Sequence, residues 1–579
     1  MARTGSRARR ISPAAALRRL LALRLAYGPA AADEKRRLLA LLGRGVLASA
    51  RALVAFHEAL LFLRAYPDDA EVAAAADELL ARFARRRDLA RHRAALAGSG
   101  LAGTVIPYPF FYATALWLAR RFPGALEIDW EQLGAGEELR GLLLDALGPV
   151  ESTWIRERRP PIRRAITTLA GTARAAATYL LERVDAMPGD GFTREALHDA
   201  ISPSYLLRPG DDTPSRTLDR APRSPLLGRS TTPRRERPDL ADELARPPLA
   251  VRTVAGREAV ELVELARRSM VTRERDLDCF CYGDPRDVRR FLHEDGLELV
   301  AIGSRPERRL LLAAAYGLLT LRNGVPIGYV QLDGFLGTTL VHFNTFETFR
   351  GADAAWVFAR ALATARVLFG SHAFAIEPYQ LGHHNDEALD SGAWWFYARL
   401  GFAPRDAAIA ALAVREAERR RRRPAARSSR RTLAQLARGY LYWEPEGRTA
   451  TVPPHAAASH AISTALAALD GVHGSQSSER AGREWVARIA GEIGLGPGTA
   501  LTADERLWLG RWAPLLATLP GISTWSREER LGLGAIVRAK AGRRESAAVQ
   551  VARSHPRFGP ALLELAAAHG YAEDERPRR

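Results

Sequence analysis

Residues 340–404 hold the pattern that most restricts the fold of this chain. A β-like apolar run, Leu340 to Phe346, ends near an Arg350-Gly351 turn, and Ala354 to Phe369 follows with helical periodicity. A second β-like run comes next, and then a helix that ends in Tyr-Ala-Arg-Leu-Gly-Phe at residues 397–402. Two strands joined through a helix form a crossover unit, which predicts parallel strands in a sheet covered by helices.

The residues before this unit add further strands to the predicted sheet. The expected elements are helices at 257–270 and 286–293, the second opened by Asp284-Pro285, and strands at 297–303, 316–322, 325–332 and 338–346. Asn323-Gly324 separates two of these strands, and this dipeptide is a strong hairpin signal because both turn positions need a positive φ. Hairpin strands followed by a crossover predict a mixed β-sheet with helices on both faces.

The flanking regions differ from this central part. Residues 14 to about 202 carry helical periodicity nearly throughout, and helical patterns return after residue 446. The stretch from 203 to 249 holds nine prolines among Arg, Ser, Thr and Asp, so neither a helix nor a central strand is expected there. The predicted fold is α+β and multidomain: an α-helical N-terminal domain (1–202), a Pro/Arg-rich linker (203–249), a mixed-sheet domain (250–446) and an α-helical C-terminal region (447–579).

The charge of the chain is a weak guide to its partner. The formal net charge is +18, but Lys35 and Lys540 are the only lysines, so arginine carries nearly all of it. An excess of arginine and alanine is typical of a GC-rich coding sequence. We therefore do not expect nucleic acid as the partner, and we interpret the Arg419–Arg423 run as a solvated helix end.

The cysteines and the apolar runs bear on location. Cys279 and Cys281 are one residue apart, which is poor geometry for a mutual disulfide, so we expect two small core residues in a reducing cytoplasm. The sequence contains no run of about 18 uncharged apolar residues, which predicts no membrane span. We expect a cytoplasmic location, and the sequence does not indicate an oligomeric state.

The turn between Arg350 and Ala355 is a candidate anion site. The first amides of a helix have no partner within the helix, and the helix dipole favours a negative charge beside them. Arg350 could pair with a phosphate, and the small residues would let the backbone approach it. An ordinary strand-to-helix connection with a surface arginine is the alternative interpretation.

Three residue patterns, together with the order of the elements, resemble the GNAT superfamily of N-acyltransferases, and one of them is the apolar strand Leu340 to Phe346 before the turn. Phe349-Arg350-Gly351 with Ala355 is similar to that family's Arg/Gln-x-x-Gly-x-Gly/Ala loop for the coenzyme A pyrophosphate. Residues 397–402 are similar to its Tyr-x-Lys/Arg-x-Gly-Phe signature. The resemblance covers about residues 250–404, and it implies a GNAT-like domain at 250–446.

The resemblance implies acyl transfer from acetyl-CoA or another acyl-CoA to an amine of a small molecule or a protein, without a metal. The cofactor-binding residues that it implies are Phe349, Arg350, Gly351, Ala352, Ala354 and Ala355. Tyr397 would protonate the leaving thiolate, and Glu347 or Glu377 would take the proton of the amine. For Tyr397 the alternative is a helix-face aromatic packed with Trp394, and for both glutamates it is a paired or solvent-facing side chain.

Other polar and aromatic residues are candidates for contact with the acceptor substrate. These candidates are His342, Asn344, Asn385 and Trp394. The neighbouring His383-His384 pair is interpreted as part of a loop that shapes the substrate mouth, because adjacent histidines seldom bind one metal ion.

One position divides two hypotheses about function. Asp353 stands where the family loop has glycine, and a carboxylate there repels phosphate unless it turns away. Asp353 favours a GNAT-derived binding or scaffold protein without catalysis, whereas Tyr397 in its signature favours an N-acyltransferase.

Overall fold

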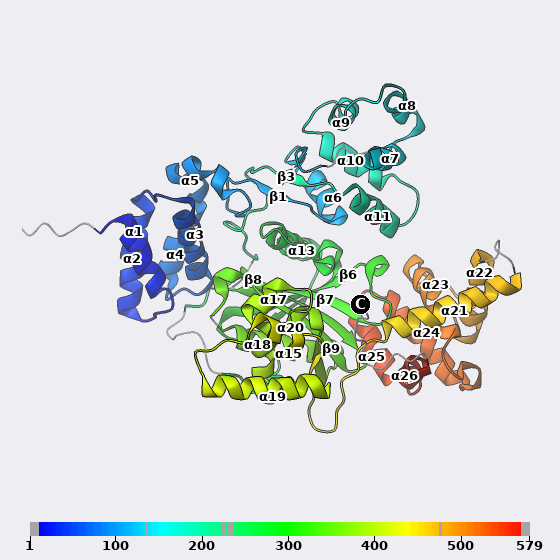
Figure 1. The fold of residues 1–579 in the computed structure, drawn as a ribbon. Helices are drawn as coiled ribbons and strands as arrows, with labels where there is room; N and C mark the ends of the chain where they lie inside the picture. The colour runs from blue at the N-terminus through cyan, green and yellow to red at the C-terminus, as the bar shows by residue number, and fades with distance from the viewer. Residues whose placement is uncertain are drawn as a thin grey trace, which may run out of the picture.

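An eight-stranded mixed sheet forms the centre of the protein (Figure 1). The computed structural model describes residues 11–133, 137–222, 224, 226–228, 237–351, 353–473 and 478–568. The strand order is β11-β10-β9-β8-β7-β6-β5-β4, in which β9 and β10 are parallel and every other neighbouring pair is antiparallel. The strands are β4 (Ala250–Val254), β5 (Gly283–Leu292), β6 (Leu297–Ser304), β7 (Ala314–Arg322), β8 (Val325–Phe335), β9 (Thr338–Thr345), β10 (Ala373–Ile376) and β11 (Leu441–Trp443).

The hairpin and the crossover confirm the local signals in the sequence. Asn323 and Gly324 have φ of 51° and 79° and join β7 to β8. The helix expected at Ala354–Phe369 is α15, with the same bounds. Residues 441–443 add the edge strand β11, which pairs with β10.

The helix predicted at 286–293 is wrong, because these residues belong to strand β5. The strand pairs with both β4 and β6, and a register shift between Gly283 and Val288 accommodates Pro285. Arg290 and Asp287 of this strand are buried. Arg290 donates to Glu298 Oε2 at 2.8 Å, so the guanidinium is paired inside the sheet.

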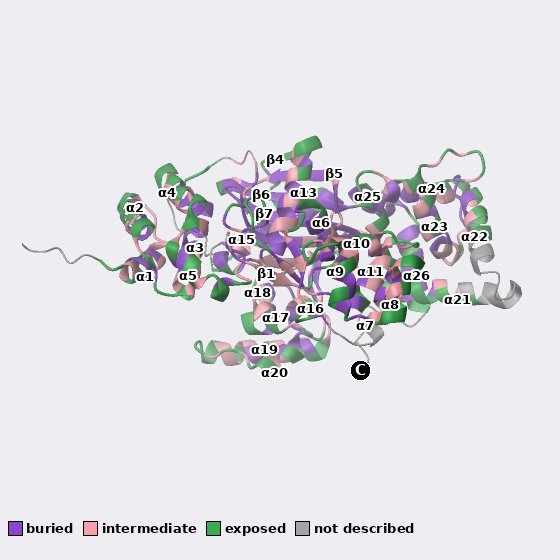
Figure 2. Ribbon diagram, turned by 90° about the horizontal axis from the view of Figure 1, so that it is seen from above, coloured by how far each residue is buried: buried purple, intermediate pink, exposed green. Residues whose placement is uncertain are grey.

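Helices cover both faces of the sheet, as predicted. A side chain at Gly317 would collide with Cys279 and Phe280 of α14, whereas one at Gly334, on the opposite face, would collide with Phe369 of α15. The helices of this part are α13 (Gly256–Val271), α14 (Asp278–Cys281), α15 (Ala354–Phe369), α16 (Pro378–Leu381), α17 (Asp386–Ser391), α18 (Ala393–Arg399), α19 (Ala407–Arg422) and α20 (Arg430–Leu436). Figure 2 shows the buried residues concentrated in the sheet, with α19 and α20 at the outside.

The N-terminal residues form two groups of elements, which belong to two different hydrophobic cores. The first is a helical bundle, whose side chains belong to the same continuous core as those of the sheet. The second has a core of its own and contains a three-stranded sheet with β3 in the centre. The bundle consists of α1 (Pro13–Leu23), α2 (Pro29–Arg44), α3 (Ala50–Ala65), α4 (Ala70–Ala81) and α5 (Arg87–His92). The second unit consists of β1 (Ile106–Tyr108), α6 (Tyr112–Arg121), β2 (Leu126–Ile128), α7 (Glu137–Ala146), α8 (Pro149–Arg158), α9 (Ile162–Ala170), α10 (Ala176–Asp185), α11 (Gly191–Ile201) and β3 (Tyr205–Leu207).

The predicted linker, 203–249, contains structure that the prolines were expected to exclude. Strand β3 fits between Pro203 and Pro209, and helix α12 (Leu240–Ala245) fits between Pro238 and Pro247. Asp239 caps α12 by accepting from the amides of Ala241 and Asp242.

Much of this stretch is packed rather than solvated. The Thr217 hydroxyl bonds to His57 and to the Ala102 amide, both at 2.9 Å. The buried Arg360 of α15 donates to the Glu243 carboxylate at 3.0 Å. The segment therefore ties the N-terminal bundle to the sheet.

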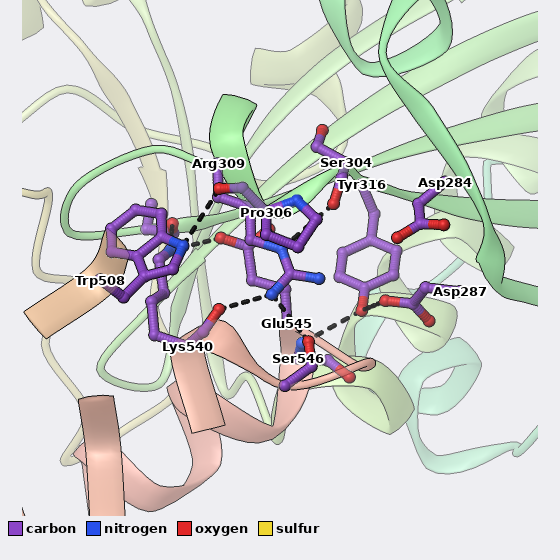
Figure 3. Close-up of polar contacts among 12 residues, drawn as sticks. Asp284, Asp287, Ser304, Pro306, Arg309, Tyr316, Trp508, Lys540, Glu545 and Ser546 are labelled. Carbon is purple, nitrogen blue, oxygen red and sulfur yellow. Dashed lines mark hydrogen bonds and ion pairs between the residues drawn. The ribbon is translucent and has the colours of Figure 1, made fainter. Parts of the chain in front are cut away.

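The C-terminal helices are anchored to the sheet by a buried polar cluster (Figure 3). Lys540 forms an ion pair with Glu545 and donates to the Ala313 carbonyl at 2.6 Å, and both charged side chains are buried. The Tyr316 hydroxyl of β7 bonds to Asp287 and accepts from the Ser546 amide at 3.0 Å. The helices are α21 (His455–His473), α22 (Ser478–Glu492), α23 (Ala503–Ala517), α24 (Arg527–Ala541), α25 (Ser546–Ser554) and α26 (Phe558–Ala568). Among the residues described, no helix has the length and apolarity needed to cross a bilayer.

Candidate functional site

Strands β9 and β10 separate at their carboxyl ends. They pair only from Thr338 with Ala373 to Leu340 with Ala375. Beyond this point β9 continues to Thr345, whereas β10 ends at Ile376. Ligands of α/β proteins bind in the crevice outside the carboxyl ends of adjacent strands, so this opening is the first place to seek a site.

A cavity of about 350 Å³ lies at this opening. Six of the residues predicted for the site line it: Asn344, Arg350, Gly351, Ala354, Asn385 and Tyr397. Its walls come from the end of β9, the turn before α15, and helices α16, α17 and α18. The fold therefore brings the turn and the Tyr-x-Arg-x-Gly-Phe helix, which are nearly fifty residues apart in the sequence, to one cavity.

The outer side of the turn faces the cavity. Gly351 has φ of 83°, and a side chain there would meet no atom within 4 Å, so the backbone is open to a ligand. The Arg350 guanidinium donates to the Thr345 carbonyl at 3.2 Å and forms an ion pair with Glu387. Of the other predicted cofactor residues, Ala355 does not line the cavity, and Ala352 lies outside the described residues.

The inner side of the turn is packed against the N-terminal bundle. Phe349 is 1% exposed and stacks on Phe62 of α3, with the ring centroids 6.3 Å apart. Its predicted contact with the cofactor is therefore not available in this arrangement. The Asp353 carboxylate also points inward, where it accepts from the Tyr66 hydroxyl at 2.9 Å and pairs with Arg322.

Tyr397 lines the cavity from an aromatic environment. Its ring packs on Phe358, Phe396 and Phe402, with centroids 5.5, 5.1 and 6.0 Å away. Burial raises the pKa of the Tyr397 hydroxyl well above its usual value. The hydroxyl is therefore protonated at neutral pH. Because no described residue forms a hydrogen bond with it, it is able to donate to a ligand atom.

The two glutamates predicted as bases have different surroundings. Glu347 is exposed, and within the described chain its side chain has no hydrogen-bond partner and does not line the cavity. Glu377 follows β10, and its Oε1 lies 3.0 Å from His342 Nδ1. His342 Nε2 lies 3.2 Å from Asp333 Oδ2, so this imidazole is held between two carboxylates.

This pairing determines the charge of the imidazole. Burial favours the neutral ring, but the two carboxylates outweigh it and raise the pKa of His342 to about 10. His342 is therefore a cation at neutral pH. It is not a lining residue of the cavity, and neither is Glu377.

The remaining predicted substrate residues divide into two groups. Asn344 lines the cavity, and its buried Oδ1 accepts no hydrogen bond from the described residues. Asn385 lines it too, but its side chain caps α17 by accepting from the Ala388 amide at 3.1 Å. Trp394 is 2% exposed and packs on Trp395, so the structure places it in the core and not in the cavity.

Sequence reasoning missed three charged residues around the site. Glu387 pairs with both Arg350 and Arg275, and these arginines lower the pKa of its carboxyl despite the opposing effect of burial. Asp333 completes the pairing of His342. Alternation along the hairpin strands places Asp333 on the same face as His342, and this pattern was a signal that could have revealed it.

The function of this cavity has to be inferred from its own residues. The described residues contain no group of three or more His, Cys, Asp or Glu side chains arranged to hold a metal ion. Comparison with known proteins finds no matching family, no matching curated sequence and no matching solved structure.

Proposed function

We propose that this chain is an N-acyltransferase that moves an acyl group from acyl-CoA to an amine. The observation that carries the proposal is the single cavity shared by Arg350, Gly351 and Tyr397 at the diverging ends of β9 and β10. These residues come from two of the patterns that resemble the GNAT superfamily. A crevice of this kind suits an extended ligand that enters between two strands.

The chain offers parts of the site that coenzyme A requires. The open backbone at Gly351 and the first turn of α15 supply amides for a pyrophosphate. Arg350 adds a positive charge at the rim, although its guanidinium is ion-paired with Glu387 in this structure. The unpartnered Asn344 Oδ1 is an acceptor suited to an amide N–H of the pantetheine arm or of the acceptor substrate.

The proposed chemistry is attack of the amine nitrogen on the thioester carbonyl carbon. A C–N bond forms, the C–S bond breaks, and the leaving sulfur takes the proton of the Tyr397 hydroxyl. We assign Glu377 as the acceptor of the amine proton, through water, because it follows β10 beside the opening. His342 is reassigned from substrate contact to the positioning of this carboxylate.

A specific observation supports the alternative of a binding protein without catalysis. Glu387 is the one carboxylate among the described lining residues, and its two arginine partners make it a poor proton acceptor. Glu377 is itself paired with the cationic His342 and does not line the cavity, so if it does not accept the amine proton, the cavity holds acyl-CoA and catalyses nothing.

Titration of the full chain with acetyl-CoA and with CoA in a calorimeter tests both functions. The transferase is supported if the titration gives saturable heat and if free thiol is released when alkylamine, arylamine or peptide acceptors are added. Saturable heat without thiol release supports the binding protein. Absence of heat at high concentration contradicts both.

A further inference from the structure

Asp353 occupies the N-cap position of α15 but does not act as a cap. An aspartate at this position usually accepts hydrogen bonds from the first-turn amides. Here its side chain accepts none of them. Oδ1 accepts instead from the Tyr66 hydroxyl at 2.9 Å, and Oδ2 pairs with the Arg322 guanidinium. The carboxylate is therefore turned away from the turn that faces the cavity.

The two partners come from distant parts of the chain. Tyr66 ends α3 of the N-terminal bundle, and Arg322 ends β7. Tyr66 and Asp353 are each 2% exposed, and Arg322 is 1% exposed. The Arg322 guanidinium also lies 5.1 Å from the Tyr66 ring centroid and 5.3 Å from that of Trp356. The negative charge is thus neutralised inside the core, where water cannot compete for it.

The end of α3 supports the turn from behind. Phe349 packs on Tyr66 with the ring centroids 6.4 Å apart, and the Asn323 side chain donates to the Ala65 carbonyl at 3.0 Å. The bundle therefore contacts the inner side of the same turn whose outer side, at Arg350 and Gly351, lines the cavity.

We propose that Tyr66 and Arg322 form a latch on Asp353, through which the N-terminal bundle keeps a carboxylate out of the cofactor turn and so sets its affinity for phosphates. This inference rests on the proposed function and gives the bundle a role in it. Tyr66 and Arg322 are positioning residues, because neither lines the cavity. Without the latch, Asp353 would turn to the first-turn amides, where it would occupy the donors of a pyrophosphate and repel its charge.

Tyr66→Phe tests the latch, and Tyr316→Phe is its matched control. Each substitution removes a buried tyrosine hydroxyl that is bonded to a carboxylate, but Tyr316 bonds to Asp287 at the C-terminal interface. We expect Tyr66→Phe to weaken CoA binding about tenfold, and less at high salt, because the freed carboxylate lies within a Debye length of the phosphates. Tyr316→Phe should leave CoA affinity within twofold of wild type.

Neutralising the carboxylate should reverse the effect. We expect Tyr66→Phe/Asp353→Asn to recover the wild-type affinity, because the asparagine carries no charge to repel phosphate. Asp353→Asn alone should change CoA affinity by less than twofold, since the wild-type carboxylate already points away. Tightening by more than about fivefold would mean that it faces the phosphates, and would overturn the latch even if Tyr66→Phe does not fold.

Hydrogen exchange separates this inference from the proposed function. If wild type binds no CoA, the transferase is contradicted, and the latch is then judged on the amides of residues 354–357. We expect Tyr66→Phe to change exchange there by at least severalfold, and Tyr316→Phe to leave it unchanged. Equal exchange in both variants, or equal CoA affinity in both, overturns the latch.

Discussion

The His342 imidazole and the Glu377 carboxylate join β9 to β10 where the backbone ladder between them stops. Leu340 and Ala375 are the last residues that pair in the ladder. Two residues further along the chain from each of them, His342 Nδ1 and Glu377 Oε1 lie 3.0 Å apart. Asp333 of β8 lies 3.2 Å from the other ring nitrogen. A charged histidine of β9 thus links β8 to the end of β10 through side chains.

This pairing predicts how stability depends on pH. The pKa of His342 is about 10 in the folded protein, above its value of about 6.5 in an unfolded chain. Its stabilising contribution is therefore complete below pH 6.5 and is lost as the pH rises towards 10. We expect His342→Gln to lower the free energy of unfolding by about 2–4 kcal/mol at pH 6 and by much less at pH 10.

Urea unfolding of wild type and His342→Gln at several pH values measures this dependence. His372→Gln is the control, because burial and two nearby arginines lower the pKa of His372 and no carboxylate raises it. A difference between wild type and His342→Gln that stays constant from pH 6 to pH 10 would show that the histidine carries no charge.

Tyr397→Phe should separate binding from catalysis. The substitution keeps the ring in its aromatic environment and removes only the proton donor, so we expect CoA affinity within twofold of wild type. The rate of thiol release should fall about a hundredfold, as for the loss of a general acid. Tyr379→Phe, whose side chain on α16 is exposed, should leave both quantities unchanged. Turnover at the wild-type rate would remove Tyr397 from the mechanism.

Glu387→Gln should strengthen CoA binding. The substitution releases Arg350 and Arg275 from their shared carboxylate, so that both can pair with phosphates at the cavity rim. We expect a gain of about threefold to tenfold that shrinks with salt, since the groups are partly exposed. Asp386→Asn makes the same change of charge one residue away, where the carboxylate pairs with Arg430. Equal gains in the two variants would show that the effect comes from net charge and not from the release of the two arginines.

Glu545→Ala should destabilise the whole protein rather than the C-terminal helices alone. It leaves Lys540 buried without its carboxylate, which costs about 3–5 kcal/mol in comparable cases. Glu528→Ala on the exposed start of α24 is the control, with an expected cost within about 0.5 kcal/mol. In the double variant Lys540→Met/Glu545→Leu we expect most of the loss to be recovered. Full stability of Glu545→Ala in urea unfolding would contradict the role of this ion pair (Figure 3).

The sequence by itself determined the elements whose signals are local. The Asn323-Gly324 turn and α15 follow from φ preferences and helical periodicity, which act over a few residues. The β5 strand escaped prediction because its state depends on pairing with β4 and β6, and Asp284-Pro285 imitated the start of a helix. In the linker, single prolines ended elements without excluding short ones between them.

The tertiary structure alone decided which way the side chains of the site face. Asp353 turns inward because Tyr66, 287 residues away, and the buried Arg322 neutralise it more effectively than the first-turn amides would. Phe349 is a core residue for the same kind of reason, since the ring of Phe62, far away in the sequence, covers it. The sequence determined that a turn and a tyrosine helix exist, and long-range packing decided which of their residues reach the cavity.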